Sequence, residues 1–302
     1  MLTTDDFRDV LVINALDRSD EIHRAFDLAF KAFESGWRES LRITFADVST
    51  KEQLAAAIND FKGSIIVFDG HGRHEKGEAA QLLLKGTSVD VWELKGLLTQ
   101  IPPIVILSAC DTHAADRNHA TTGNGFLSLG VRTVLASVFP LFALDAATFI
   151  ARLLFRVAVY LPMVTRALGR AVGWNEVVSG MLRMKLLTDY LRKLNGDGLI
   201  DESTYLKVHK FGNEVLNGGE MPPSPEPFAL VDQMLINEFA LPQGELKSAF
   251  QTALASSSVL SYIQLGRPET IAIATPEAEA TFGRIYEAIH APEDDDATKP
   301  SE

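Results

Sequence analysis

The chain has 302 residues, a formal net charge of −12 and 46% apolar residues. This apolar content is enough for a large buried core, so the chain can fold as one large domain or as one domain with an addition. It also excludes a disordered protein. The excess of acidic residues argues against a direct nucleic-acid-binding protein, because phosphate-binding surfaces are built from Lys and Arg. Four basic residues, Arg152, Arg156, Arg166 and Arg170, do lie close together. We expect them to form the solvated face of a helix.

The chain contains a single cysteine, Cys110. An internal disulfide is therefore impossible, which fits a reducing compartment. A single cysteine also excludes a zinc or iron–sulfur site held by four cysteines of this chain. No secretory signal pattern opens the sequence, and the most apolar stretch, residues 146–162, is too short and too charged to span a bilayer. We expect a cytoplasmic protein with no membrane association.

Strand and helix patterns alternate through the first half of the chain. Short apolar runs predict buried strands at residues 9–16, 41–48, 63–70, 104–110 and 131–139. Helical periodicity or helix-start signals predict helices at residues 21–35, 51–61 and 145–160, the second beginning at a capping box formed by Ser49 and Glu52. Residues 81–94 predict a hairpin, with a helix following as far as Gln100. This alternation with short connections predicts a mainly parallel sheet flanked by helices.

The second half of the chain has a different pattern. Residues 165–246 are predicted to be helical, with Gly- and Pro-rich loops, and residues 259–274 read as a late strand and turn. Pro276 opens a final helix. We expect one domain over residues 1–290, with a helical insert at about 165–246, and an acidic disordered tail at 291–302. The insert fits three interpretations: a lid, a partner-binding segment or part of the core.

Two residue types that together perform nucleophilic catalysis follow two of the predicted strands. His71 follows the run IIVFDG and Cys110 follows IVILSA. If these strands are neighbours in a parallel sheet, both side chains emerge at its carboxyl edge, where catalysis in such sheets gathers. A thiolate is the attacking form of cysteine, and a nearby imidazole promotes its formation. Gly70 and Gly72, on either side of His71, would allow a substrate backbone to approach closely.

Several segments of the sequence together resemble a known family. The segments IIVFDGHG, IVILSACDT and GFLSLGVRTVLASVFPL, with DAAT beyond them, are similar to the CHAT peptidases, relatives of caspases and separase. SYIQLGRPE resembles the closing strand of that family. Phe139 stands where the family usually has Trp, the segment before the closing strand is longer than expected, and no tetratricopeptide repeats accompany the domain.

The resemblance implies a three-layer caspase-like fold and a His71–Cys110 dyad. In such a dyad Cys110 attacks a peptide carbonyl, and His71 protonates the leaving amine and later activates water. The backbone N–H groups of Gly72 and Cys110 would hold the oxyanion. No metal or organic cofactor is needed.

Substrate specificity is predicted from acidic residues near the strand ends. Asp17, Asp69, Asp111 and Asp145 are the candidates for binding an Arg or Lys side chain through charge-assisted hydrogen bonds. For Asp145 the competing interpretation is a helix N-cap, because it precedes AATF.

Two other functions compete with peptidase activity. A zinc site could use His71, His74, Cys110 and His113, with His119 nearby, although the spacing forms no closed zinc knuckle. A caspase-like domain can also act as an inactive binding or scaffold module, but such a module would usually have lost one dyad residue. A phosphate-binding P-loop is absent from the sequence.

The resemblance also implies a biological setting. CHAT peptidases carry out limited, regulated proteolysis, often in bacterial defence or programmed death. The expected partners are a protein substrate, for example a gasdermin-like or other effector encoded nearby, and an activating sensor. We expect the helical segment at 165–246 to be the surface that contacts the activator.

Overall fold

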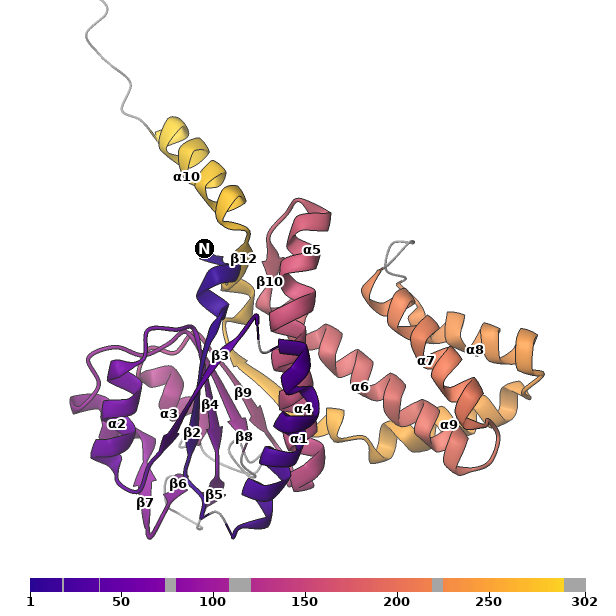
Figure 1. The fold of residues 1–302 in the computed structure, drawn as a ribbon, viewed down its shortest axis with the longest axis horizontal. Helices are drawn as coiled ribbons and strands as arrows, with labels where there is room; N and C mark the ends of the chain where they lie inside the picture. Colours follow the sequence, from indigo (N-terminus) through magenta and orange to yellow (C-terminus); the bar gives the residue numbers. More distant parts are fainter. Residues whose placement is uncertain (18, 38, 74–79, 109–120, 219–224, 291–302) are drawn as a thin grey trace, which may run out of the picture.

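The computed structural model describes residues 1–17, 19–37, 39–73, 80–108, 121–218 and 225–290. Its centre is a six-stranded sheet with the order β11-β9-β8-β4-β2-β3 (Figure 1). Five strands are parallel: β2 (Asp9–Asn14), β3 (Arg42–Asp47), β4 (Ile65–Asp69), β8 (Ile104–Ser108) and β9 (Thr133–Ser137). β11 (Tyr262–Gly266) runs antiparallel to β9. The predicted mainly parallel sheet is confirmed, and so is the late strand.

Helices cover both faces of this sheet. Alternate residues of β4 point to opposite faces. Ile65 and Val67 join a core formed with α1 (Glu21–Trp37) and α4 (Ala143–Phe155). Ile66 and Phe68 join a second core, formed with α2 (Lys51–Asp60), α3 (Thr122–Ser128) and the 3-10 helix η2 (Val91–Gly96). The central strands are apolar except at their ends because both of their faces are buried. This arrangement confirms the three-layer α/β fold.

The start of α2 differs from the prediction by one residue. The N-cap is Thr50, whose side chain accepts a hydrogen bond from the Gln53 amide, and the Ser49 amide donates to Gln53 Oε1 at 2.8 Å. The prediction that Ser49 and Glu52 form the capping box was therefore wrong. Thr50 and Gln53 satisfy the same spacing rule one position later, so the sequence pattern alone did not fix the register.

The helix after β9 is longer than predicted. α4 continues through a π-helical turn, η3 (Arg156–Tyr160), into α5 (Leu161–Leu168). Within the described chain, the run Ala143–Leu168 has the length and apolar composition of a membrane span, but 56% of its most apolar window is buried inside the protein. We therefore regard it as a core helix.

Two of the basic residues on this run, Arg152 and Arg156, are not solvated, contrary to the prediction. Arg156 is only 8% exposed, and its guanidinium lies 3.8 Å from the centre of the Tyr160 ring and donates to Asn217 Oδ1 at 2.6 Å. Arg152 is half-buried and donates to Thr188 Oγ1 at 3.2 Å. Both side chains are covered by helices from the second half of the chain, a cover that local sequence does not reveal. Arg166 and Arg170 are exposed, as expected.

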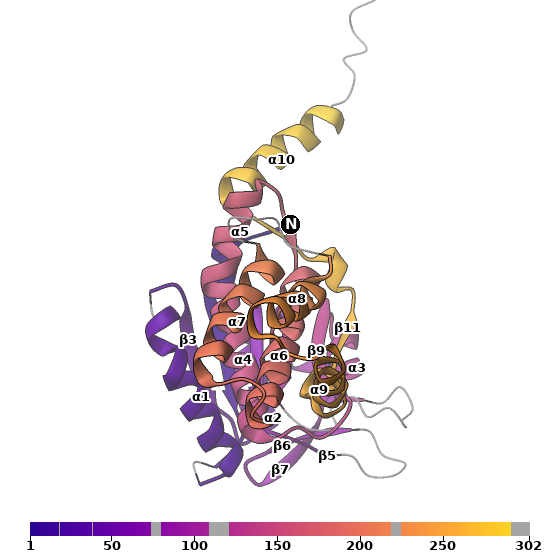
Figure 2. The same ribbon diagram turned by 90° about the vertical axis from the view of Figure 1, so that its right-hand side faces the viewer.

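After the end of α5 and a short strand, the predicted helical segment consists of four helices (Figure 1 and Figure 2). They are α6 (Trp174–Gly196), α7 (Glu202–Asn217), α8 (Pro227–Phe239) and α9 (Gln243–Ser256). Of these, α6 packs against α4, and the others pack on α6 and on one another. Leu187, Leu191 and Val208 belong to the same buried cluster as Ile150 of α4. The helical block, residues 174–256, thus shares its core with the sheet.

Short strands lie at each edge of the central sheet (Figure 1). At the carboxyl edge, β5 (His71–Arg73), β6 (Gln81–Leu84) and β7 (Thr87–Asp90) form an antiparallel ribbon, which confirms the predicted hairpin. The helix predicted to reach Gln100 is instead the 3-10 turn η2. At the opposite edge, β12 (Ala272–Ala274) lies between β1 (Leu2–Thr3) and β10 (Val172–Gly173). The final helix α10 (Pro276–His290) begins at Pro276 as predicted. The remaining 3-10 turns are η1 (Thr4–Phe7), η4 (Ser258–Ser261) and η5 (Pro268–Thr270).

Candidate active site

The strands that precede His71 and Cys110 are neighbours. β4 and β8 pair in parallel, with Asp69 opposite Ser108, and the Gly70 amide donates to the Ser108 carbonyl oxygen at 3.3 Å. His71 follows at once, opening β5. The condition on which the dyad prediction depended, that the two strands lie side by side, is met. Cys110 lies two positions beyond Ser108, outside the described residues.

Gly70 is required where the chain turns from β4 into β5. A Cβ atom there would lie 2.5 Å from Cε1 of Phe68 and 3.2 Å from Cβ of Ala15. Real Cβ atoms do not approach a ring so closely, and the Phe68 ring is buried. The glycine therefore lets the backbone carry His71 past a packed ring to the edge of the sheet.

The His71 ring is held by a carboxylate from another part of the chain. Its Nε2 atom lies 3.2 Å from Oδ2 of Asp20, and both side chains are partly exposed. The other carboxylate oxygen of Asp20 accepts a hydrogen bond from the Ile22 amide at 2.8 Å. Burial alone would raise the pKa of Asp20, but the hydrogen bonds from Ile22 and His71, with the nearby positive charge, outweigh it and lower the pKa. Asp20 is therefore a carboxylate at neutral pH.

A second acid–histidine pair lies beneath this contact. Asp69 is 0% exposed, and its Oδ2 atom is 3.9 Å from Nδ1 of His23 on α1. Within the described part of the chain, neither carboxyl oxygen of Asp69 has a hydrogen-bond partner. Burial, followed by repulsion from Asp20 and Asp27, raises the pKa of Asp69 to about 8. Asp69 is thus mostly protonated at neutral pH.

The other predicted specificity residues lie in different settings. Asp17 is exposed in the loop before α1. Asp145 lies in the first turn of α4, whose N-cap is Phe142, so the competing N-cap interpretation was wrong. Its carboxylate pairs with Lys185 at 3.1 Å and accepts from Ser258. Asp111 is outside the described residues. Among the described residues, Asp17, Asp69 and Asp145 thus lie in three different surroundings: exposed, fully buried and paired with Lys185.

The remaining predicted site residues are only partly visible. Gly72, the predicted oxyanion donor, lies in β5 opposite Leu82 of β6. Of the alternative zinc ligands, only His71 is described; His74, Cys110, His113 and the nearby His119 are not. Among the described residues no group of three or more His, Cys, Asp or Glu side chains is arranged to hold a metal ion. The zinc alternative therefore stays a prediction.

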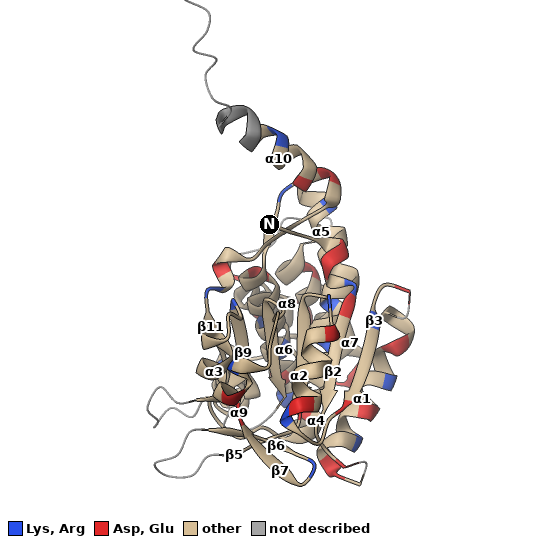
Figure 3. Ribbon diagram, turned by 90° about the vertical axis from the view of Figure 1, so that its left-hand side faces the viewer, with Lys and Arg blue, Asp and Glu red and all other residues tan. Residues whose placement is uncertain are grey.

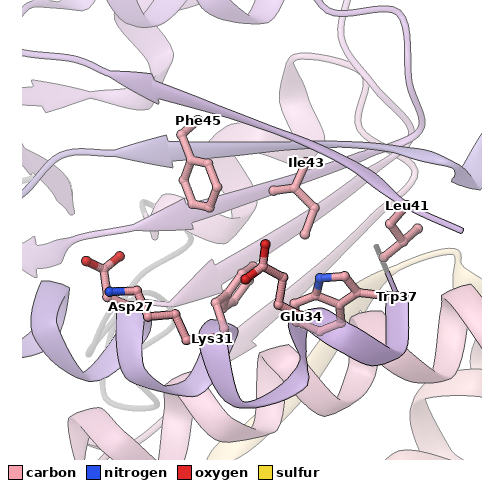
Figure 4. Close-up of a pocket in the computed structure, with 8 residues that line it drawn as sticks. Asp27, Lys31, Glu34, Trp37, Leu41, Ile43 and Phe45 are labelled. Atoms are coloured by element: carbon pink, nitrogen blue, oxygen red, sulfur yellow. The ribbon is translucent and has the colours of Figure 1, made fainter. Parts of the chain in front are cut away.

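An apolar groove lies elsewhere, between α1 and the edge strand β3 (Figure 4). It encloses about 330 Å³ and is lined mainly by Phe30, Trp37, Ile43 and Phe45, with Asp27, Lys31 and Glu34 at its rim. None of its lining residues is a cysteine, serine or histidine, so it offers neither a nucleophile nor an imidazole base. On the same side of the molecule acidic and basic residues are interspersed (Figure 3). The chemistry of the described chain therefore points to the carboxyl edge.

Sequence reasoning missed Asp20 and His23. Asp20 precedes the apolar stripe of α1, which is a helix-start signal, and it follows a strand that ends at the carboxyl edge. Those two facts together could have placed a carboxylate near His71. His23 gave no such signal, because it lies in the first turn of an amphipathic helix and its burial depends on the packing of α1 over the sheet.

The fold is an α/β fold in which a mainly parallel sheet lies between two layers of helices. At the carboxyl edge of this sheet the site holds a histidine that is bonded to a carboxylate. The family model of the CHAT domain matches residues 19–174, just over half of the chain. The chain therefore belongs to the CHAT family, which is related to the caspase-like cysteine peptidases. A comparison with curated proteins gave no match.

Proposed function

We propose that the protein is a cysteine endopeptidase whose catalytic residues are His71 and Cys110. The observation that carries the proposal is the pairing of β4 with β8, in register at Asp69 and Ser108, so that the strands preceding His71 and Cys110 end side by side at one edge of the sheet. Membership of the CHAT family supports the same chemistry. The position of His71, bound by a carboxylate and still partly exposed, suits a general base.

The proposed reaction has two steps. The Cys110 thiolate attacks the peptide carbonyl carbon, the C–N bond breaks, and the leaving amine takes a proton from His71. A water molecule then gives its proton to His71 and hydrolyses the thioester, which releases the acid and restores the thiol. The backbone N–H groups of Gly72 and Cys110 would stabilise the oxyanion in both steps. The residues assigned to these steps need no metal or cofactor.

We further propose that the enzyme cuts after Arg or Lys. Asp17 and Asp111 are the better candidates to bind that side chain. Asp69 is fully buried and mostly protonated, and Asp145 already pairs with Lys185.

In biological terms, the proposal is limited proteolysis in the cytoplasm of a bacterium, as part of a defence or death system. The substrate would be an effector such as a gasdermin-like protein, and a sensor would activate the enzyme through the helical block.

The test is to co-express the protein with its genomic neighbours and to map new N-termini by mass spectrometry, for wild type, Cys110→Ala and His71→Ala. We expect cleavage in the wild type, none in Cys110→Ala, and a loss of about 100-fold or more in His71→Ala, the range for a general acid–base. The residue before each cut reports the specificity directly.

Alkylation of Cys110 covers the case in which no cleavage is seen. Fast alkylation at neutral pH that depends on His71 would identify a latent enzyme with a poised thiolate. Slow alkylation that is unchanged in His71→Ala would contradict the proposal and favour an inactive binding module.

A further inference from the structure

The structure places a third side chain in contact with the proposed catalytic histidine. We infer that Asp20 is a positioning residue, which fixes the orientation and tautomer of His71 for reaction with Cys110. This inference rests on the proposed peptidase function and adds to it a residue that the two-residue dyad does not contain. The contact that carries it is the 3.2 Å distance between His71 Nε2 and Asp20 Oδ2.

The carboxylate of Asp20 is held in place by its own backbone surroundings. Oδ1 accepts from the Ile22 amide at 2.8 Å, and the Asp20 carbonyl oxygen accepts from the Arg24 amide at 3.1 Å, so Asp20 caps the start of α1. With Oδ1 occupied in this way, Oδ2 is the oxygen that faces His71. A group fixed by a helix start orients a ring better than a free loop side chain does.

The loop that carries Asp20 is itself tied to β4, the strand that leads into His71. The Ala15 amide, just after β2, donates to the Asp69 carbonyl oxygen at 3.0 Å. β2 and β4 are also paired along their length, up to Asn14 opposite Asp69. Asp20 and His71 therefore leave adjacent strands at the same edge, and their contact follows from the sheet register.

The contact decides which ring nitrogen is available for chemistry. A carboxylate accepts hydrogen bonds and donates none, so Nε2 must carry the hydrogen and the lone pair of the neutral ring lies on Nδ1. Nδ1 is then the atom that takes the proton from the thiol. Once the ring is protonated, the negative charge of Asp20 stabilises it, as in other acid–histidine–nucleophile units.

Asp20→Asn isolates this role. The asparagine keeps an oxygen for the Ile22 amide, and Asn is as good an N-cap as Asp, so α1 should remain intact. The NH₂ group cannot accept the hydrogen of Nε2–H. Asp27→Asn is the matched control, because Asp27 is a carboxylate of the same helix that lies 3.8 Å from His23 Nε2 and is not bonded to His71.

Two readouts test the inference on the full chain. The first is the imidazole ¹⁵N spectrum of His71 at a pH where the ring is neutral, which reports the tautomer. We expect Nε2–H in wild type and Asp27→Asn, and a shift towards Nδ1–H in Asp20→Asn. The second is iodoacetamide alkylation of Cys110 at pH 7, which we expect Asp20→Asn to slow about tenfold or more and Asp27→Asn to leave unchanged.

A double variant separates a role through His71 from a general loss of structure. In a His71→Ala background, Asp20→Asn should have no further effect on alkylation, because the two residues act as one unit. An unchanged tautomer and rate in Asp20→Asn, with wild-type alkylation fast and dependent on His71, would overturn the inference and leave the peptidase proposal standing. Wild-type alkylation that is slow and independent of His71 would overturn the peptidase proposal and, with it, the role of Asp20.

Discussion

Asp69 and Lys185 are both buried ionisable side chains, and their surroundings differ in an instructive way. At the carboxyl edge, Asp69 is fully buried and has no hydrogen-bond partner among the described residues. At the boundary between the sheet and the helical block, Lys185 of α6 has a side chain that is only 7% exposed. Its ammonium group lies 2.7 Å from Asp189 and 3.1 Å from Asp145.

The contrast is between a closed polar network and a buried acid beside the proposed active site. Around Lys185 the carboxylates are satisfied in turn, because Ser257 donates to Asp189 and Ser258 donates to Asp145. Such a closed network joins α4, α6 and the segment after α9. Asp69 is instead kept largely protonated by burial and by neighbouring carboxylates, a cost that folds usually accept only near sites of chemistry. Three predictions test this difference.

The largest effect is expected from breaking the Lys185 network. Lys185→Met leaves Asp145 and Asp189 without their buried cation, and the free energy of unfolding should fall by about 3–5 kcal/mol. Urea denaturation measures it. Lys193→Met is the matched control. Lys193 forms a Lys–Asp pair with the same i,i+4 spacing further along the chain, 2.6 Å from Asp197, but its side chain is 36% exposed. That variant should lose less than about 1 kcal/mol. Equal losses in the two variants would show that burial does not distinguish the pairs.

The next effect concerns Asp69 and pH. Its pKa in the folded state, about 8, is above its value in an unfolded chain, so the folded state holds a proton that the unfolded state releases between about pH 4 and 8. The wild type should therefore lose stability as the pH rises through this range, by about 2 kcal/mol from pH 6 to 8.

Asp69→Asn should remove that part of the pH dependence and should be more stable than the wild type at pH 8. Asp17→Asn, which changes an exposed carboxylate, is the control. Thermal unfolding across the pH range measures both variants. If the stability of Asp69→Asn falls with pH as steeply as that of the wild type, Asp69 is ionised in the folded state and the contrast with Lys185 disappears.

The smallest effect is expected at the edge of the Lys185 network. Ser257→Ala removes the 2.5 Å hydrogen bond to Asp189 and the weaker one that the hydroxyl oxygen accepts from the Val259 amide at 3.3 Å, and it should reduce the free energy of unfolding by about 1–2 kcal/mol. Its neighbour Ser256 is exposed and bonds only to carbonyl oxygens of its own helix, so Ser256→Ala should change stability by less than about 0.5 kcal/mol. Both values come from urea denaturation. A loss in Ser257→Ala no larger than in Ser256→Ala would show that the network does not depend on this hydroxyl.

Much of the fold could be predicted because its signals are local. The buried strands are uninterrupted apolar runs, and Pro276 opens a helix in the sequence as in the structure. The placement of His71 after β4, next to β8, followed from the same signals and from the general rule for parallel sheets.

The features that sequence reasoning missed depend on long-range packing. Lys185 and Arg156 look like ordinary charges on helix surfaces, and only the arrangement of other helices buries them. The contact between Asp20 and His71 joins residues 51 positions apart, and no periodicity records it. The burial of Asp69 depends on α1 covering the carboxyl end of β4. Such contacts are set by tertiary structure, whereas strand and helix patterns reflect the local chain.

The three-stranded sheet β1-β12-β10, at the edge of the central sheet opposite the carboxyl edge, has a practical consequence. β1 pairs with β12, and α10 departs from the same place, so both ends of the described chain emerge on the side opposite β5 and His71 (Figure 1). A fluorophore or surface tether attached to β1 or to α10 would stand away from the carboxyl edge. These two elements therefore offer labelling sites for single-molecule or binding measurements that leave the proposed active site open to solution.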